Sequence, residues 1–474
     1  MNIILIQTDQ QRRDTLSCYG NEITHTPAID ELAKKGTVFE NAFTPSPICA
    51  PARAALLTGK LPSHNGILIN SESGVPAGRD FKKSYQTYSQ CLTEKKYQCH
   101  HIGKWHIGTK DTPQDYNFEG VFYPGYGYPS NHEHYLNYLK TLGLDGFILE
   151  KEVYSTFKDG EQRALLSAIQ TGGKEASVPW YLCNQTLDAI DIGAKSDQPF
   201  FVSCNFWGPH VPYIIPEEYA DMYDPKDMIK PPSFHDDLKN KPRVQQEMKE
   251  YWGVQDLEWE DWAKLTSANY GYISLIDKQV DRILKHLEQL NITEETAIIF
   301  TTDHGGMVGS HGLCDKGPYL YDDICRVPLI TYLPQQKPEQ RINADVYTMD
   351  LMPTFIELAD GDTPEDIDAL SLLPLINGTK EILRDEPMYI EFYGHQVSVM
   401  QKLLRTKEWK YIFNGQEFDE YYDLINDPHE MINEINNPNF KSEIQHARDQ
   451  MTIKLKSLKD PSFRYFHGTR MHEG

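Results

Sequence analysis

The 474-residue sequence predicts an α/β fold, in which helices sandwich a large, mixed, mostly parallel sheet. Short apolar runs without polar alternation are typical of strands buried on both faces of such a sheet. These runs alternate with helical segments, which favours a sheet covered on both sides. After about residue 380 the chain changes to short strands at hairpin spacing. We therefore expect an α/β domain over 1–380 and a small α+β subdomain over 381–474.

The main sheet is expected to draw on segments that are continuously apolar or alternate with a period of two. These strands cover residues 3–8, 36–43, 199–206, 297–302 and 327–332, and residues 97–108 are expected to form a further strand that opens into a glycine-bounded turn. Helical periodicity predicts helices over 26–33, 85–95 and 265–290. Between these elements, we expect residues 130–195 to be mostly helical and 214–262 to form short helices and loops.

The C-terminal part is expected to form a small antiparallel sheet with one helix. Its predicted strands cover residues 388–392, 397–400, 409–413 and 420–424. The predicted helix covers about 441–458. Short strands at this spacing are typical of hairpins.

Composition and charge exclude several classes of protein. A net charge of −23 argues against nucleic-acid binding, which needs a basic surface. No stretch approaches the roughly 18 consecutive apolar residues of a membrane span. Eight cysteines without a C-x-x-C pair indicate reduced thiols. The N-terminus lacks a secretory signal, which predicts a cytoplasmic protein, or a periplasmic one if a leader has been removed.

The segment from Pro47 to Lys60 is expected to begin a helix with a thiol at its start. Pro51 suits a first helical position, and Gly59 is a plausible C-terminal stop. Cys49 would then face unpaired backbone N–H groups, where negative charge is favoured. Arg53, one turn on, can point to the same place. A buried structural cysteine is the simpler interpretation of a single thiol.

Polar side chains follow two of the predicted core strands. Asp9 and Gln10 follow the first, and Asp303 and His304 follow the strand at 297–302. Ligands gather at the carboxyl ends of parallel strands. Two carboxylates, an amide and an imidazole suit Ca²⁺ or Mg²⁺, and the imidazole keeps Mn²⁺ or Zn²⁺ open. Taken singly, each pair is equally well explained as a cap between strand and turn.

A set of basic side chains lies beside the Cys49 segment or in turns that follow strands. Its members are Arg53, Lys104, His106, His210 and Lys316. Lys104 and His106 are two residues apart, so they would share one face of an extended segment. Each alone is most simply a solvated surface residue. Together they indicate a site for an anion.

Six segments in this order resemble the type I, formylglycine-dependent sulfatases of the alkaline phosphatase superfamily. They are the opening strand with Asp9-Gln10, Cys49 to Arg53 with Thr58-Gly59-Lys60, Gly103 to Gly108, Pro209 to Pro212, Thr302 to Gly305, and Tyr421 to Glu430. The resemblance covers most of the chain and implies an alkaline-phosphatase-like fold.

The resemblance also implies a cofactor set. A formylglycine-generating maturation enzyme would convert Cys49 to formylglycine, whose hydrate attacks the sulfur of a sulfate ester. One divalent cation is implied, first of all Ca²⁺, with Mg²⁺ or Mn²⁺ as alternatives. The implied metal ligands are Asp9, Gln10, Cys49, Asp303 and His304.

Catalytic roles follow from the same resemblance. Lys104, His210 and Lys316 would bind the sulfate oxygens, and His210 or Lys316 would protonate the leaving alcohol. His106 would be the base that returns the aldehyde. Arg53 and Lys104 would hold the hydrate formed at Cys49.

The substrate is predicted from finer likenesses. Gln10 resembles the choline sulfatases and phosphonate monoester hydrolases, whereas Asp303-His304 with Lys316 resembles iduronate-2-sulfatase. We expect a sulfated carbohydrate, such as a 2-O-sulfated uronic acid unit of a glycosaminoglycan. An aromatic loop at 122–128 would either flank the pocket together with His132 and His134 or pack on the surface.

Two other functions stay open. One is hydrolysis of a phosphonate monoester or phosphodiester by the same array, because these esters differ from sulfates more in charge than in shape. The other is a catalytically silent relative that binds sulfated glycans. The sequence does not determine an oligomeric state.

Overall fold

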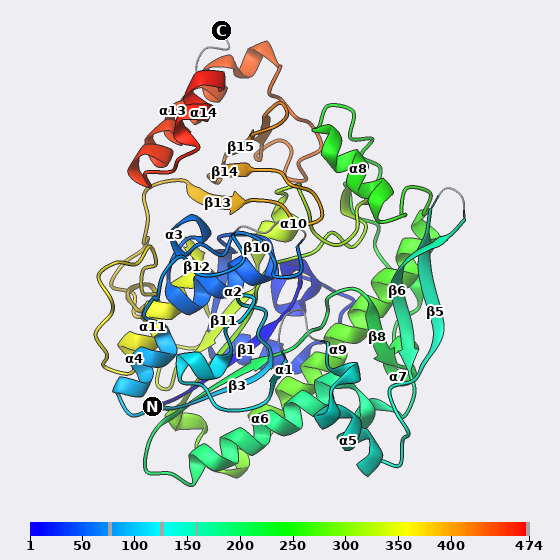
Figure 1. Ribbon diagram of the computed structural model, residues 1–474, viewed down its shortest axis with the longest axis vertical. Coiled ribbons are helices and arrows are strands. Elements are labelled where there is room, and N and C mark those ends of the chain that lie inside the picture. The colour runs from blue at the N-terminus through cyan, green and yellow to red at the C-terminus, as the bar shows by residue number, and fades with distance from the viewer. Residues whose placement is uncertain (74–77, 124–127, 158–159, 471–474) are drawn as a thin grey trace.

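The computed structural model describes residues 1–73, 78–123, 128–157 and 160–470, and Figure 1 shows its architecture. The main sheet has nine strands in the order β10-β2-β11-β9-β1-β7-β3-β4, with β12 beside β2. These strands are β1 (Asn2–Thr8), β2 (Thr37–Phe43), β3 (Gln98–Lys104), β4 (Phe122–Tyr123), β7 (Phe200–Asn205), β9 (Thr296–Thr302), β10 (Arg326–Val327), β11 (Leu329–Tyr332) and β12 (Gln340–Tyr347). Because β10 and β11 run antiparallel to their neighbours, the sheet is mixed but mostly parallel, which confirms the predicted fold class.

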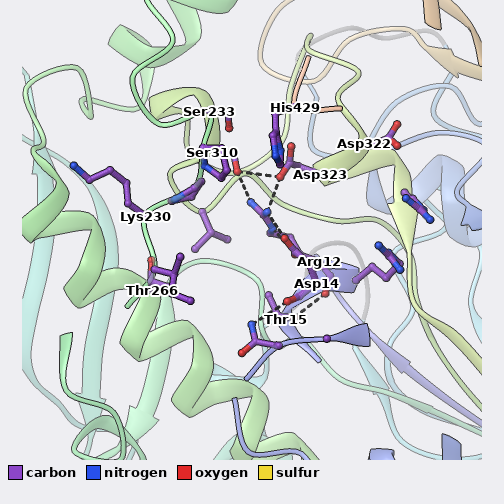
Figure 2. Close-up of a pocket in the computed structure, with 18 of the residues that line it drawn as sticks. Arg12, Asp14, Thr15, Lys230, Ser233, Thr266, Ser310, Asp322, Asp323 and His429 are labelled. Carbon is purple, nitrogen blue, oxygen red and sulfur yellow. Dashed lines mark hydrogen bonds and ion pairs between the residues drawn. The ribbon is translucent and has the colours of Figure 1, made fainter. Parts of the chain in front are cut away.

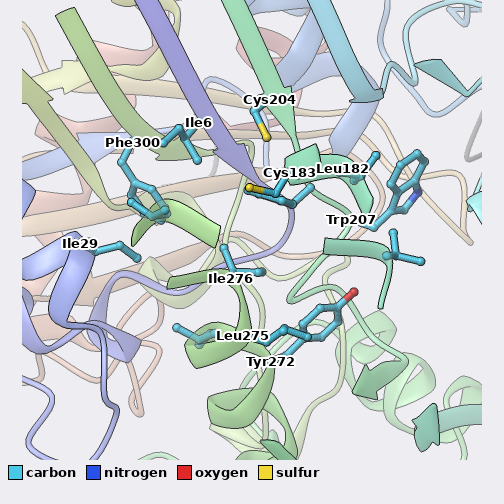
Figure 3. Packing of buried hydrophobic residues seen from close by; sticks show 14 of the residues in the cluster. Ile6, Ile29, Leu182, Cys183, Cys204, Trp207, Tyr272, Leu275, Ile276 and Phe300 are labelled. Carbon is cyan, nitrogen blue, oxygen red and sulfur yellow. The ribbon is translucent and has the colours of Figure 1, made fainter. Parts of the chain in front are cut away.

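Strand β1 shows why an apolar run without alternation indicates a sheet buried on both faces. Ile3 and Leu5 belong to the core on one face, and Ile4 and Ile6 belong to the core on the other. The first core includes residues of α2 (Cys49–Thr58), α4 (Tyr88–Glu94) and α11 (Leu351–Leu358); the second includes residues of α1 (Pro27–Lys35), α6 (Val178–Ala194) and α9 (Trp259–Gln289). Figure 3 shows the second core, with Ile276 of α9 facing Ile6 and Phe300 of the sheet.

The expectation that 130–195 is mostly helical is only partly right. Helices α5 (Glu133–Thr141) and α6 are present, but a hairpin of β5 (Leu149–Thr156) and β6 (Gln162–Gln170) lies between them. The hairpin joins β8 (Tyr213–Pro216) in a separate three-stranded sheet, at the right of Figure 1. Most of β5 is exposed, so it lacks the apolar face by which a strand is recognised.

The C-terminal sheet contains β13 (Met388–Phe392), β14 (Gln401–Arg405), β15 (Trp409–Asn414) and β16 (Glu420–Asp423), all antiparallel. It lies with α13 (Lys441–Ser457) and α14 (Phe463–Arg470) at the top of Figure 1. The strand predicted at 397–400 is wrong, because those residues belong to the loop between β13 and β14. Its core is continuous with Phe43, Ile48 and Met307, which are close in sequence to predicted site residues.

Five further α-helices, with ten 3-10 helices between the elements, complete the secondary structure of the described residues. They are α3 (Pro62–Asn65), α7 (Glu217–Ala220), α8 (Arg243–Tyr251), α10 (Asp322–Cys325) and α12 (Leu373–Ile376). Within the ranges that the structure describes, no helix combines the length and apolar character needed to cross a bilayer.

Candidate active site

The order of strands in the sheet brings four loops together. Strands β9, β1, β7 and β3 are adjacent and parallel, so their carboxyl ends meet at one edge. Thr8 pairs with Thr302, which places Asp9 beside Asp303. Lys104 ends β3 at the same edge. The parallel arrangement therefore converts positions far apart in sequence into one cluster.

A group of four buried side chains could hold a metal ion: Asp9, Cys49, Asp303 and His304, whose ligand atoms all lie within 4.8 Å of one another. The Sγ atom of Cys49 is 3.2 Å from Nε2 of His304 and 3.7 Å from Oδ1 of Asp9. Nδ1 of His304 donates to the carbonyl of Gly305 at 2.7 Å. Burial lowers the pKa of His304, so the ring is neutral at neutral pH. A lone pair on Nε2 therefore faces the cluster.

Gln10 supplies a further oxygen beside this cluster. Its backbone has a φ of 59°, and its N–H donates to Oδ1 of Asp303 at 3.2 Å. Its side-chain Oε1 is buried and has no hydrogen-bond partner among the described residues. An orphaned oxygen on a residue whose backbone bonds Asp303 is available to a divalent cation that prefers oxygen ligands.

Two cations balance the carboxylates of the cluster. Arg53 donates from Nε to Asp303 at 2.8 Å and lies 3.5 Å from Asp9, while Lys104 forms a short ion pair with Asp9. All four side chains are at most 2% exposed. Burial alone would raise the pKa of Asp9, but Lys104 and the neighbouring cations hold that pKa well below its usual range. Asp9 is therefore ionised and able to act as a ligand.

Helix α2 begins at Cys49, two residues earlier than the sequence predicts. Pro51 is therefore the third helical residue, not the first, and Ile48 is the N-cap. The predicted stop is correct, because Gly59 ends the helix with a φ of 65°. The N–H of Ala50 donates to Oδ1 of Asn70 at 3.0 Å. Cys49 thus occupies the first turn of a ten-residue helix, where negative charge is stabilised.

His106 does not share an extended face with Lys104. Strand β3 ends at Lys104, and His106 has a φ of 54°, so the chain turns between them. Nε2 of His106 lies 2.8 Å from Oε2 of Glu72. Glu72 also accepts from Asn70 at 3.0 Å, so these two residues link His106 to the start of α2. The sequence contains no motif that marks Asn70 or Glu72.

His210 and Lys316 form a second basic pair. Lys316 donates to Nε2 of His210 at 2.6 Å, and Nδ1 of His210 bonds the carbonyl of Val211. Asp315, which sequence reasoning missed, lies 3.2 Å from Nζ of Lys316. Burial and the adjacent Lys316 lower the pKa of His210 to about 3. The imidazole is therefore neutral beside a charged ammonium group.

This environment makes His210 a source of pH-dependent stability. Because its folded pKa of about 3 lies below the ordinary 6.5, the unfolded chain binds more protons between these pH values. The stabilisation is full above about pH 6.5 and is lost as the pH falls towards 3. We expect His210→Gln to lose less stability than the wild type over this range, by a few kcal/mol. Urea unfolding of the two metal-free proteins at several pH values measures the free energy of unfolding of each. If this free energy changes with pH in parallel for the two proteins, the expectation is contradicted.

A cavity of about 570 Å³ adjoins the cluster. Its lining residues include Cys49, His210 and Lys316, and the others are Asn70, Glu72, Ser73, Ala164, Leu165, Val211, Pro212, Tyr251, Trp252, Asp315, His395 and Gln396. His395 and Gln396 come from the β13–β14 loop and were not predicted.

The aromatic loop at 122–128 is described only in part. Residues 124–127 lie outside the described residues. Tyr123 and Tyr128 pack against Trp207, with ring centroids 5.4 and 6.0 Å away, and His132 packs on Tyr123 at 4.5 Å. These rings and His134 are not among the described residues that line the cavity. Packing is the interpretation that the described part of this loop supports.

A second cavity, of about 430 Å³, surrounds Arg12 (Figure 2). Arg12 forms ion pairs with Asp14 at 2.6 Å and Asp323 at 2.7 Å, and it donates to Ser310 and to the Met307 carbonyl. The sequence-predicted site residues, all of them in the described ranges, do not line this cavity. Arg12, Asp14, Ser310 and Asp323 form a network that ties the loop after β1 to the segment after β9.

Comparisons with known proteins agree with this geometry. A family model described as Sulfatase matches residues 1–361, and one described as N-sulphoglucosamine sulphohydrolase, C-terminal, matches 309–459. The chain is similar to a protein of Escherichia coli (strain K12) named Uncharacterized sulfatase YidJ, at 29% identity over 97% of this chain and 88% of that protein.

Two solved structures share the fold. The phosphonate monoester hydrolase of Agrobacterium radiobacter superposes with a TM-score of 0.81 at 21% identity, over 96% of this chain and 95% of that one. A protein in complex with its substrate D-glucosamine-2-N,6-O-disulfate superposes with a TM-score of 0.76 at 20% identity, over 97% and 98% of the two chains.

Proposed function

Because this chain belongs to the sulfatase family, we propose that it hydrolyses the sulfate ester of a carbohydrate, with a nucleophile made from Cys49. One observation carries the proposal. Cys49 begins α2 among two carboxylates and an imidazole, and it lines a cavity together with His210 and Lys316. A thiol packed only for structure would not need this charged surrounding.

Two groups that the family uses would complete the site. Formylglycine at position 49 would supply a hydrated aldehyde as nucleophile, and a divalent cation would supply positive charge beside the sulfate. Asp9, Gln10, Asp303 and His304 would hold the cation, and their mainly oxygen donors favour Ca²⁺. Modification of Cys49 requires a maturation enzyme as partner.

Basic side chains of this chain would bind and orient the sulfate. Lys104 and Lys316 would each hold an oxygen of the sulfate, and Arg53 would keep the carboxylates of Asp9 and Asp303 in place. Lys316 and His210, 2.6 Å apart, would deliver a proton to the leaving alcohol oxygen.

His106 would act in the second half of the reaction. Glu72 is 2.8 Å from its Nε2, and an ionised Glu72 can only accept a hydrogen bond. The hydrogen bond from His106 lowers the pKa of Glu72 against the effect of its burial, so it stays ionised. The proton of the ring therefore lies on Nε2, and Nδ1 would accept a proton.

Similarity to proteins that act on sulfated sugars supports a carbohydrate substrate. An enzyme assay is needed to test it. The structural relative in complex with glucosamine disulfate and the C-terminal family match both involve sulfated glucosamine. A 2-O-sulfated uronic acid remains the finer expectation from the sequence. Defined sulfated monosaccharides and disaccharides, assayed for released sulfate, would identify the sugar.

A phosphonate monoester or phosphodiester hydrolase is the second candidate, favoured by the structural likeness to such an enzyme and by Gln10. We expect matured protein to cleave 4-nitrophenyl sulfate with a kcat/KM at least about tenfold above that for 4-nitrophenyl phenylphosphonate, a difference of about 1.4 kcal/mol. Released nitrophenol measures both rates. A preference for the phosphonate would select the second candidate.

A silent sulfated-glycan-binding protein is the third candidate. The mass of the peptide that contains residue 49, from a host with the maturation system, distinguishes it. An unmodified thiol in every preparation, together with sulfated-glycan binding and no turnover, would favour binding over catalysis.

A further inference from the structure

The catalytic cavity extends beyond the sulfate end into a wall built from outside the main sheet. Trp252 follows α8, and His395 and Gln396 lie in the loop between β13 and β14 of the C-terminal sheet. Ala164 and Leu165 of β6 also line the cavity and likewise come from outside the main sheet. If the proposed function holds, the part of the substrate that carries the sulfate must contact this wall.

The β13–β14 loop has a backbone suited to presenting His395 and Gln396. Gly394 has a φ of 112°, and a Cβ atom there would lie 2.5 Å from the carbonyl oxygen of Val397. The N–H of His395 donates to that same oxygen at 3.2 Å. Only a glycine allows this close approach, so the turn places Gln396 at its tip.

His395 is tied to the catalytic pair through Asp315. Its Nε2 lies 3.7 Å from Oδ2 of Asp315, whose other oxygen is 3.2 Å from Nζ of Lys316. The side chain of His395 is 13% exposed and Asp315 is 1% exposed. A buried carboxylate therefore connects the wall to the groups that would protonate the leaving alcohol.

The polar atoms of the wall are not all used within the protein. Oε1 of Gln396 and Nε1 of Trp252 are buried and have no hydrogen-bond partner among the described residues. Leaving such groups unpaired costs about 1–3 kcal/mol each, so ligand sites are where they are tolerated. An indole, an imidazole and an amide together offer a flat apolar face with donors and acceptors. That combination suits the hydroxyl groups and ring face of a sugar.

The charge of the lining restricts which sugar fits. Among the described lining residues, Lys316 at the sulfate end is the one Lys or Arg, whereas Glu72 and Asp315 are acidic. A sugar carboxylate placed on the wall would lose its hydration without gaining a cationic partner. A neutral or amino sugar would not have this penalty.

We propose that Trp252, His395 and Gln396 form the sugar-binding wall and that they select a sugar whose sulfate is its one negative group. The proposal rests on the proposed sulfatase function. It assigns to the C-terminal sheet a part in substrate recognition. It also argues against the 2-O-sulfated uronic acid that the sequence suggested.

His395→Ala and Gln396→Ala, assayed with two substrates, test the recognition role. We expect kcat/KM for N-acetylglucosamine 6-sulfate to fall by about 10- to 100-fold, as when a hydrogen-bonded polar contact is lost. For 4-nitrophenyl sulfate, which has no hydroxyl groups beside its ester, we expect Gln396→Ala to lose less than about threefold. His395→Ala removes the neighbour of Asp315, which holds Lys316, so it should lower both rates but lower the sugar rate more. His429→Ala, which alters the cavity around Arg12, is the matched control and should leave both rates unchanged.

Equal losses on both substrates, or no loss on either, would overturn the role of the wall. The proposed selection against a second negative group on the sugar is tested with the wild-type protein. The wild type should cleave N-acetylglucosamine 6-sulfate at least about tenfold better than a 2-O-sulfated uronate disaccharide, and the reverse order would overturn the charge selection. A wild type that cleaves aryl sulfate but neither sugar also overturns the proposal. A wild type inactive on aryl sulfate contradicts the proposed function itself.

Discussion

Cys49→Ala is expected to lower kcat/KM for 4-nitrophenyl sulfate by on the order of 10⁴-fold or more, because it removes the thiol that would be converted to the proposed formylglycine nucleophile. The residual rate would come from the charges that bind the sulfate. Alanine is smaller than cysteine and fits the first turn of α2, so the fold should persist. Initial rates of nitrophenol release, with circular dichroism on the same sample, measure both effects.

The matched control is Cys99→Ala, a buried cysteine of β3 away from the cluster. It should lose some stability from the cavity it leaves but keep the rate. A Cys49→Ala protein that retains more than about a tenth of the wild-type rate would show that position 49 is not the nucleophile. Peptide mass at residue 49 completes the test, because full activity from an unmodified thiol would exclude formylglycine as the nucleophile.

Asp303→Asn is expected to have the second largest effect, on cation affinity. Oδ1 of Asp303 accepts from the N–H groups of Gln10 and His304, and Oδ2 accepts from Arg53. An amide keeps the shape but removes a charge next to the proposed cation. We expect Ca²⁺ affinity to fall by at least about tenfold, with a comparable loss of rate at limiting Ca²⁺. Calorimetric titration of the chelator-treated protein measures the affinity.

Loss of a buried charge also destabilises the folded protein. The control variant must therefore remove a buried charge at another place in the chain. Asp236 is 8% exposed and bonds Lys241 and His311 away from the cluster. Asp236→Asn should lower stability, because it removes one partner of a buried pair, and leave Ca²⁺ affinity unchanged. Equal affinities for Asp303→Asn and the wild type would remove Asp303 from the proposed cation site.

The charges of the site are consistent with the proposed cation and the proposed anionic substrate. Arg53 and Lys104 are engaged by Asp9 and Asp303, and Lys316 is engaged by Asp315. The chain as a whole carries −23, which repels sulfate at long range. With carboxylates and cations paired in this way, a divalent cation would give the site the positive excess that binding a sulfate requires.

The cavity residues that the sequence predicted follow local sequence patterns, whereas those that it missed do not. His210 and Lys316 stand in turns after strands, and such local patterns can be recognised in a sequence. Asn70, Glu72 and His395 lie in loops without a pattern, and they reach the cavity through contacts with distant segments. The face-sharing argument for Lys104 and His106 failed because a positive φ at His106 ends the extended segment.

By itself, the sequence predicted strands β1, β2, β3, β7, β9 and β11 of the main sheet, the segment that begins at Cys49 and the polar pairs that follow β1 and β9, but it missed β4 and β12. Each depends on neighbouring residues, because strand burial, helix starts and turns are local properties. The tertiary structure decided which strand ends lie side by side, and so brought Asp9 within reach of Lys104 and Asp303. It also decided that His395 and Gln396, from a loop of the C-terminal sheet, line the cavity. Long-range packing determines these contacts, and no local pattern encodes it.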